Sequence, residues 1–202
     1  MGFDRRRGAR LKGRAIAFGT DGVRGVANKG LLPEHAARLG LAAARLFGGP
    51  IALGRDTRLS GGMLASALSS GAASGGANVI DLGVLPTPAV AALAPRLGAA
   101  AAAVVSASHN PYPDNGIKFF SGEGRKLSAG TERDLEALTA DDDFERPTGD
   151  GVGSVERLQS APGLYVEVVL GRLRPRAGGL KVLLDCANGA AHEVAPIAFG
   201  EL

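Results

Sequence analysis

The chain has 202 residues, of which 45% are hydrophobic and 21% are charged, and its formal net charge is +3. This balance is typical of a globular protein and excludes disordered, fibrous and membrane-spanning classes, while the length suits one domain and part of a second. The single cysteine, Cys186, excludes an internal disulfide and suits a reducing compartment, so we expect a cytoplasmic protein.

Positive charge is concentrated at the start of the chain. Residues 1–14 carry a net charge of +5, so the remainder sums to −2. We expect these residues to be a basic disordered leader. An arm that touches nucleic acid or directs targeting is the alternative, but the body is not basic and we expect no nucleic-acid partner. The mostly apolar stretch 88–107 contains Pro95 and Arg96, so we expect no membrane span.

The first motif is the segment 19–25, Gly-Thr-Asp-Gly-Val-Arg-Gly, which follows a short apolar run. Its glycines allow a close backbone approach, and Arg24 offers a planar fork of donors that suits phosphate. On spacing alone, a tight turn with a solvated arginine is the simpler interpretation.

Predicted helices and strands then alternate along the chain. Apolar residues recur at spacings of three and four over 33–47, Pro33 suits a first helical turn, and Gly48 ends the helix. We expect further helices over 61–75 and 89–97, and strands over 51–54, 78–82 and 99–105. This alternation predicts an α/β fold, a three-layer domain whose mostly parallel mixed sheet is covered by helices.

The loop 55–61, Arg-Asp-Thr-Arg-Leu-Ser-Gly, joins one predicted strand to the next helix. We expect Asp56 to pair with Arg55 or Arg58 and so brace the loop, and Ser60 to cap the helix. This pattern favours a supporting role over catalysis.

The segment 106–116, Ser-Ala-Ser-His-Asn-Pro-Tyr-Pro-Asp-Asn-Gly, is the candidate site. It follows a predicted buried strand and leads into the alternating run 117–120, where Lys118 points away from its apolar neighbours. Ligands of open α/β sheets bind beyond the carboxyl ends of the strands. We therefore expect Ser108 at the mouth of a pocket, with His109 and Lys118 close by.

The residues alone leave three interpretations of Ser108. It could belong to a polar turn that satisfies nearby backbone donors. A hydrolase nucleophile is disfavoured, because no Gly-x-Ser-x-Gly surrounds it and His109 is its immediate neighbour. A phosphorylated serine would carry roughly two negative charges, which Lys118, a protonated His109 or a metal would balance.

The segments 106–111 and 114–120 together resemble the phosphoserine loop of the α-D-phosphohexomutases, and most closely that of the bacterial phosphoglucosamine mutase branch. The segments 18–25 and 55–61 resemble motifs of that family's first domain, and 185–190 resembles the opening of its second. The resemblance implies an isomerase that interconverts glucosamine 6-phosphate and glucosamine 1-phosphate through a phosphoserine and a bisphosphate. A phosphomannomutase or phosphoglucomutase of the same family, or a non-catalytic phosphate-binding remnant, are the alternatives.

The same resemblance implies roles for individual residues. Ser108, His109 and Lys118 would be catalytic, and Thr20, Arg24 and Asn110 would bind phosphate or substrate. Mg²⁺ would bind an oxygen of the Ser108 phosphate together with aspartates that this chain lacks. Glucosamine or glucose 1,6-bisphosphate would prime the serine, the partner would be a small sugar phosphate, and a homodimer is left open.

The end of the chain predicts a second unit. We expect a first domain over 15–140, a linker over 141–155, and an incomplete start of a similar second domain over 156–202. That start would include a helix over 165–173 and a strand over 181–185. The aspartates 141–143 are interpreted as a solvated run, because consecutive residues do not face one ion. No Asp-Gly-Asp-Gly-Asp-Arg metal loop is present, so we expect a truncated chain that is inactive alone.

Overall fold

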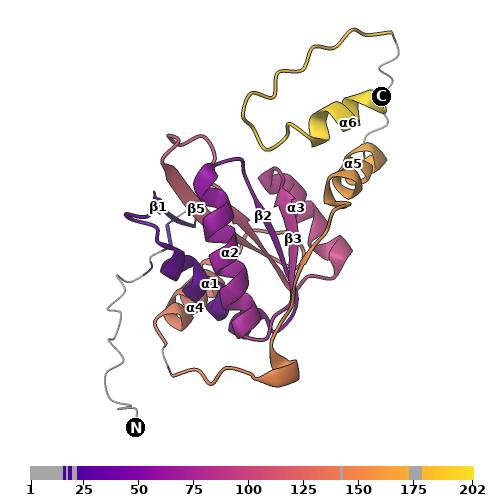
Figure 1. Cartoon of the computed structure of the whole chain (residues 1–202). Helices are drawn as coiled ribbons and strands as arrows, with labels where there is room; N and C mark the ends of the chain where they lie inside the picture. Colours follow the sequence, from indigo (N-terminus) through magenta and orange to yellow (C-terminus); the bar gives the residue numbers. More distant parts are fainter. Residues whose placement is uncertain (1–15, 17, 20–21, 142, 173–178) are drawn as a thin grey trace, which may run out of the picture.

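The computed structural model describes residues 16, 18–19, 22–141, 143–172 and 179–202, so the predicted leader at 1–14 lies outside the described residues. It confirms the predicted fold class, a mixed sheet with helices on both faces (Figure 1). The strands are β1 (Val23–Val26), β2 (Ile51–Arg55), β3 (Val79–Val84), β4 (Ala101–Val105), β5 (Asp114–Ser121) and β6 (Val155–Arg157). The helices are α1 (Pro33–Phe47), α2 (Leu59–Ser74), α3 (Thr87–Leu93), α4 (Ala129–Thr139), α5 (Ala161–Arg172) and α6 (Val194–Gly200), with 3₁₀ turns η1 (Pro95–Leu97) and η2 (Gly149–Gly151).

The strand order is β1-β5-β4-β2-β3-β6, and the predicted site lies at the carboxyl ends of its central strands. The pairs β2–β4, β2–β3 and β3–β6 are parallel, whereas β5 runs antiparallel to β4 and β1. The carboxyl ends of β2, β3 and β4 therefore lie side by side. The connection between β4 and β5, which carries Ser108, begins at the same end of the sheet.

Alternating residues of the central strands build two apolar cores. On β2, Ile51 and Leu53 join the cluster that α1 and α2 cover, while Ala52 joins the cluster under α3. On β4, the same alternation separates Val105 from Val104. A strand buried on both faces reads as a continuous apolar run, which is why these segments were predictable.

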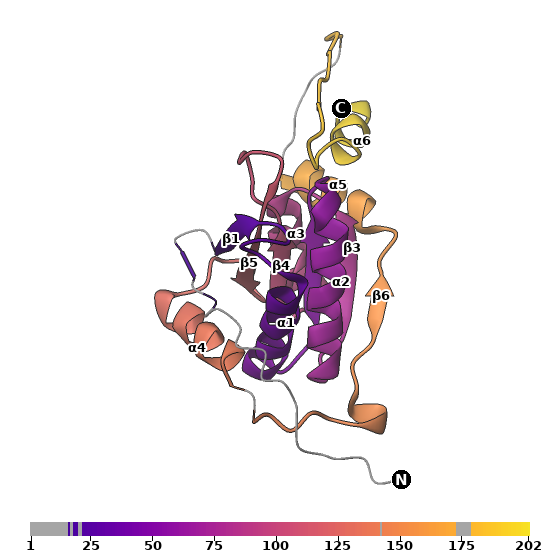
Figure 2. The ribbon, with the colours of Figure 1, turned by 60° about the vertical axis from the view of Figure 1, so that its left-hand side comes forward.

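Helices α1 and α2 lie side by side over the sheet (Figure 2), and two glycines let them approach closely. A Cβ atom on Gly40 would lie 2.0 Å from the carbonyl oxygen of Leu68, and one on Gly71 would lie 1.9 Å from that of Ala37. No side chain fits at either position, so the helix backbones themselves are in contact here.

Two helix ends have clear local signals, of which Gly48 is the one predicted above. Gly48 ends α1 in the left-handed conformation, at φ 62°. The Ser128 hydroxyl accepts the amide hydrogen of Thr131 and caps α4. The predicted helix over 89–97 is instead the helix α3 followed by η1, because Pro95 lacks the N–H that would continue the helix.

The prediction that Ser60 caps the second helix is wrong. Helix α2 begins at Leu59, with Arg58 in the capping position. The amide of Arg58 donates to Asp56 Oδ1 at 3.0 Å, and this bond fixes the chain before the helix. Ser60 lies within the first turn, where its hydroxyl accepts a hydrogen bond from Asn115 Nδ2 at 2.9 Å.

The sheet extends past residue 140, at which we expected the first domain to end. Strand β6 pairs with β3, and α5 places Ala161 and Val166 in the core under α3. The strand predicted at Lys181–Asp185 is wrong: these residues form no strand, and Leu183 is 96% exposed. A strand needs a partner, and the described part of the chain supplies none here. The start of a second domain stays a prediction.

Within the residues that the structure describes, no helix combines the length and apolar character needed to cross a membrane.

Candidate functional site

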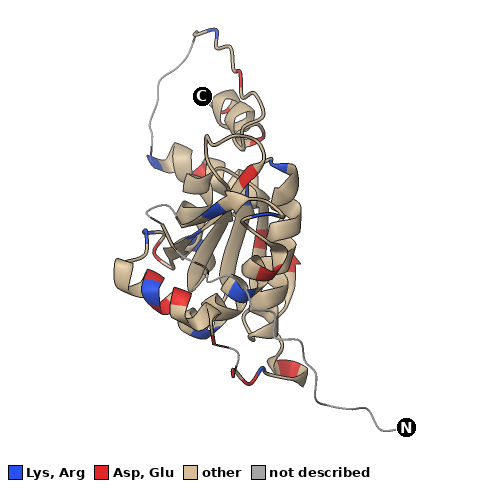
Figure 3. Ribbon diagram, turned by 90° about the vertical axis from the view of Figure 1, so that its left-hand side faces the viewer, with Lys and Arg blue, Asp and Glu red and all other residues tan. Residues whose placement is uncertain are grey.

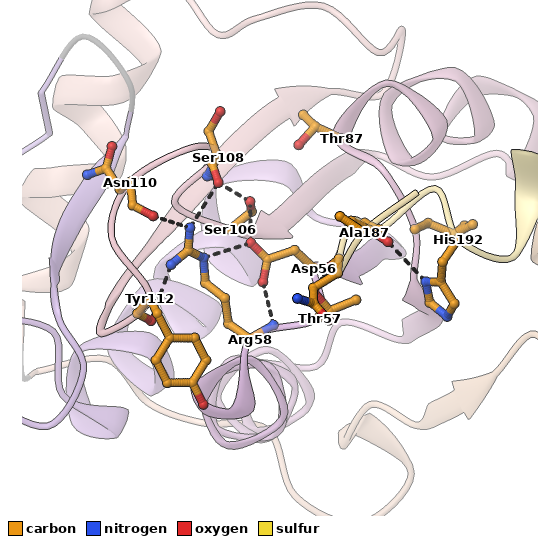
Figure 4. A pocket seen from close by; sticks show the side chains of 14 residues that line it. Asp56, Thr57, Arg58, Thr87, Ser106, Ser108, Asn110, Tyr112, Ala187 and His192 are labelled. Carbon is orange, nitrogen blue, oxygen red and sulfur yellow. Dashed lines mark hydrogen bonds and ion pairs between the residues drawn. The ribbon is translucent and has the colours of Figure 1, made fainter. Parts of the chain in front are cut away.

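A cleft of about 820 Å³ opens beyond the carboxyl ends of β2, β3 and β4. Its walls come from the loops that follow these strands, at 56–58, 85–87 and 106–112, and from the segment 187–192 (Figure 4). Ser108 lines this cleft, as the sequence predicts.

Ser108 has a fixed backbone and an exposed hydroxyl. Its φ of +57° is left-handed, which is uncommon for a residue other than glycine. Its amide donates to Ser106 Oγ at 3.0 Å, and its carbonyl oxygen accepts from Arg58 Nη2 at 2.9 Å. Figure 4 shows the hydroxyl pointing away from the Asp56–Arg58 pair. That hydroxyl lies 3.3 Å from Nδ1 of His109, so the two predicted catalytic groups are in contact.

Ser106 differs from Ser108 in both burial and bonding. It is 9% exposed, and its hydroxyl donates to Asp56 Oδ2 at 2.7 Å while accepting the Ser108 amide. The hydroxyl of Ser106 therefore uses both its proton and a lone pair in hydrogen bonds within the protein. Both serines line the cleft, but of the two only Ser108 has an exposed side chain.

Arg58 bonds to the backbone of residues 106–114, the connection from β4 to β5 that we call the serine loop. Its Nε forms an ion pair with Asp56 Oδ2 at 3.1 Å, which confirms one of the two pairings we predicted. Its two terminal nitrogens donate to five backbone carbonyl oxygens of the loop, those of Ser108, Asn110, Pro111, Tyr112 and Asp114, over 2.7–3.2 Å. The supporting role predicted for the loop 55–61 thus falls mainly on Arg58.

Arg24 lies at the same loop although it is far away in sequence. From β1, its Nη1 donates to Asn110 Oδ1 at 3.0 Å. Asn110 in turn donates to Asp114 Oδ2 at 3.1 Å, across the loop. The structure therefore brings together Arg24, Asn110, His109 and Ser108.

Two further predicted site residues stay predictions. Lys118 lies on β5 opposite Val104, on the face of the sheet that α3 covers, and its role stays a prediction. Thr20 lies outside the described residues.

The segment 185–192 contributes residues to the cleft that our sequence reasoning left without a role. The Thr57 hydroxyl donates to the carbonyl oxygen of Asn188 and so joins this segment to the loop after β2. His192 lines the cleft, with Nδ1 3.0 Å from the carbonyl oxygen of Gly189. The resemblance at 185–190 marked this segment, but only the contacts show that it reaches the loop after β2 and lines the same cleft as Ser108.

The described residues supply no metal centre of their own. They include no group of three or more His, Cys, Asp or Glu side chains placed to hold an ion. In the view of Figure 3, acidic and basic residues are interspersed over the body rather than sorted by sign.

Comparison with known proteins gives consistent matches. Residues 15–146 match the family model described as phosphoglucomutase/phosphomannomutase, alpha/beta/alpha domain I. A phosphoglucosamine mutase of Rubrobacter xylanophilus is 71% identical over 191 residues, and one of Moorella thermoacetica is 50% identical over 192 residues. These matches cover 95% and 92% of this chain but 43% of each relative, so the chain spans less than half their length.

A solved structure shares the fold. The crystal structure of a phosphoglucomutase/phosphomannomutase family protein from Burkholderia thailandensis superimposes with a TM-score of 0.73 at 30% sequence identity. The superposition covers 88% of this chain and 40% of that one.

Proposed function

The chain belongs to the phosphoglucomutase/phosphomannomutase family, and we propose that its Ser108 carries the phosphoryl group in a mutase acting on glucosamine phosphate. Phosphoserine would give its phosphoryl group to one hydroxyl of the sugar phosphate and form a bisphosphate. The serine would then recover a phosphoryl group from the other position, so that glucosamine 6-phosphate and glucosamine 1-phosphate interconvert.

The observation that carries this proposal is the contrast between the two serines of the loop. The hydroxyl of Ser106 is buried and bonded to Asp56, whereas that of Ser108 is exposed to the cleft beside His109. A phosphoryl group needs space for three oxygens, and only Ser108 offers it. The bonded backbone of Ser108 also fixes the direction of its Cα–Cβ bond, and positioning is the main contribution that a protein makes to phosphoryl transfer.

Groups around Ser108 suit a charged phosphate. His109 Nδ1 is 3.3 Å from the hydroxyl oxygen, near enough to take its proton as the phosphoryl group arrives and return it as the group leaves. Arg24 lies at the loop through Asn110, where its charge would favour the phosphorylated form. Lys118 is proposed as a further cation on the evidence of the family resemblance alone.

Mg²⁺ enters the proposal only as a partner of the Ser108 phosphate. The described residues do not form a metal cluster by themselves, so this chain would contribute a phosphate oxygen and no further identified ligand. When bound, the ion would neutralise charge on the transferring group. We also propose glucosamine or glucose 1,6-bisphosphate as the primer and the cytoplasm as the location.

The choice of sugar depends on the relatives. The 71% identical relative bears the name phosphoglucosamine mutase, which favours glucosamine phosphate. The solved structure at 30% identity bears the broader family name, so glucose or mannose phosphate is the second candidate.

A chimaera tests the proposal without requiring this chain to work alone. Residues 15–202 replace the corresponding part of the Rubrobacter xylanophilus relative, and the chimaera is assayed with glucosamine, glucose and mannose phosphates. We expect glucosamine phosphate to be interconverted fastest and one phosphoryl group to be found on Ser108 by mass spectrometry. Ser108→Ala should lose both properties, whereas Ser66→Ala, on the exposed face of α2, should keep them. Full activity in Ser108→Ala would refute the proposal.

A further inference from the structure

We propose that Arg58 is a positioning residue for phosphoryl transfer, one that holds the serine loop in its reactive conformation and does not bind the phosphate. This inference rests on the proposed function. It concerns an arginine that sits in the wall of the cleft, three residues after β2, where its charge alone would suggest a phosphate ligand.

The hydrogen-bond donors of Arg58 are all in use. A guanidinium group has five N–H donors in a fixed planar arrangement. The structure gives Arg58 six acceptors: Asp56 Oδ2 for Nε, three carbonyl oxygens for Nη1 and two for Nη2. At least one N–H is therefore shared between two oxygens, and none is left to point at a ligand. The side chain is only 11% exposed.

The direction of these bonds supports the same conclusion. Arg58 meets Ser108 through the carbonyl oxygen of that residue, at 2.9 Å from Nη2, while the hydroxyl points the opposite way (Figure 4). A phosphate on Ser108 would therefore lie on the far side of the loop from the guanidinium. In contrast, Arg24 reaches the loop from β1 and bonds to a side chain, that of Asn110.

The loop conformation depends on a cation at this position. Five carbonyl oxygens converge on Arg58, and without positive charge between them their dipoles would repel one another. The left-handed backbone of Ser108, at φ +57°, costs on the order of 1–3 kcal/mol and persists only where its surroundings hold it. Arg58 bonds to the Ser108 carbonyl, while Asp56, its ion-pair partner, orients Ser106 toward the Ser108 amide.

Lysine should not replace arginine here. Its ammonium group keeps the charge but has three donors at one point, so it cannot span five carbonyl oxygens. Arg58→Lys is therefore the informative variant, since Arg58→Ala could simply unfold the chain. Arg45→Lys is the matched control. Arg45 is 16% exposed and forms an ion pair with Asp141, but it lies in the last turn of α1, near the amino-terminal ends of the parallel strands and away from the cleft.

The first test is amide hydrogen exchange on the full 202-residue chain. In Arg58→Lys, the amides of Ser108, Asn110 and Asp114 should exchange at least about 10-fold faster, while core amides of β2 and β4 keep their protection. In Arg45→Lys, the loop amides should not change. Unchanged loop exchange in Arg58→Lys would overturn the inference, and so would equal loss of protection in loop and core.

The second test uses the chimaera described above. Arg58→Lys should lower kcat about 100-fold, as a misplaced nucleophile does, while KM for the sugar phosphate changes less than about 3-fold. Guanidinium ion added to a folded Arg58→Ala chimaera should restore part of the rate, and ammonium should not. A raised KM with unchanged kcat would show Arg58 to be a phosphate ligand and overturn the inference. An inactive unsubstituted chimaera would instead contradict the proposed function, leaving the exchange test to decide on Arg58.

Discussion

Replacing Ser106 by alanine should destabilise the protein while leaving its surface almost unchanged. The Ser106 hydroxyl makes two hydrogen bonds from a site that is 9% exposed, one to the Asp56 carboxylate at 2.7 Å and one from the Ser108 amide at 3.0 Å. A bond to a charged group contributes about 1.5–3 kcal/mol and a neutral one about 0.5–1.5 kcal/mol. In Ser106→Ala, Asp56 keeps its two hydrogen bonds from Arg58, so the loss of stability is smaller than the sum of these two terms. We expect a loss of about 2–3 kcal/mol.

The assay is urea unfolding of the 202-residue chain, with Ser108→Ala as the matched variant. The hydroxyl of Ser108 is exposed, and among the described residues its one side-chain hydrogen bond is to the neighbouring His109, so its removal should change the free energy of unfolding by no more than about 0.5 kcal/mol. In the chimaera the order reverses: Ser108→Ala loses phosphorylation completely, and Ser106→Ala retains it at a reduced rate.

Equal effects of the two substitutions on stability would refute this reasoning. So would a loss below about 0.5 kcal/mol in Ser106→Ala, because water would then satisfy Asp56 and the Ser108 amide as well as the hydroxyl does.

Two further predictions concern the scaffold. Gly71→Ala should destabilise the chain by at least about 2 kcal/mol, because its Cβ would meet the Ala37 carbonyl oxygen. Gly62→Ala, in open space on the same helix, is the control and should stabilise the chain by up to about 1 kcal/mol. Equal urea midpoints for the two variants would contradict the close packing of α1 and α2. The hydrogen bond from Arg45 holds the pKa of Asp141 below its ordinary value of 3.8, so this carboxylate stabilises the fold above that value and ceases to do so as the pH falls through the lowered pKa. Urea midpoints measured from about pH 6 to about pH 3 should therefore fall less steeply in Asp141→Asn, and parallel curves would contradict the pairing.

Local sequence signals account for most of the scaffold. The residues of α1 carry their own periodicity and end signals, and its predicted bounds, Pro33–Phe47, are those observed. The central strands were predictable because both of their faces are buried, which leaves an apolar run between turns. The position of Ser108 followed from the end of such a run.

Features that depend on contacts across the chain were harder to predict. Strand β6 is exposed along its length and is defined only by its pairing with β3. The apolar pattern at 181–185 predicted a strand, yet pattern alone does not supply the neighbour that a strand needs. Arg58 could be assigned to loop support, but the convergence of carbonyl oxygens some fifty positions later in the chain appears only in three dimensions.

The bonds between Arg58 and the serine loop also bear on how this reactive element could be moved into another protein. A graft of residues 106–114 onto the end of a foreign strand would transfer the hydroxyl but not the support beneath it. The unit that would have to be transferred is instead a pair of loops, 55–58 and 106–114, which follow two adjacent parallel strands and are joined through Arg58. Any engineered scaffold would have to accept both, in this register, before the serine could be expected to keep its orientation.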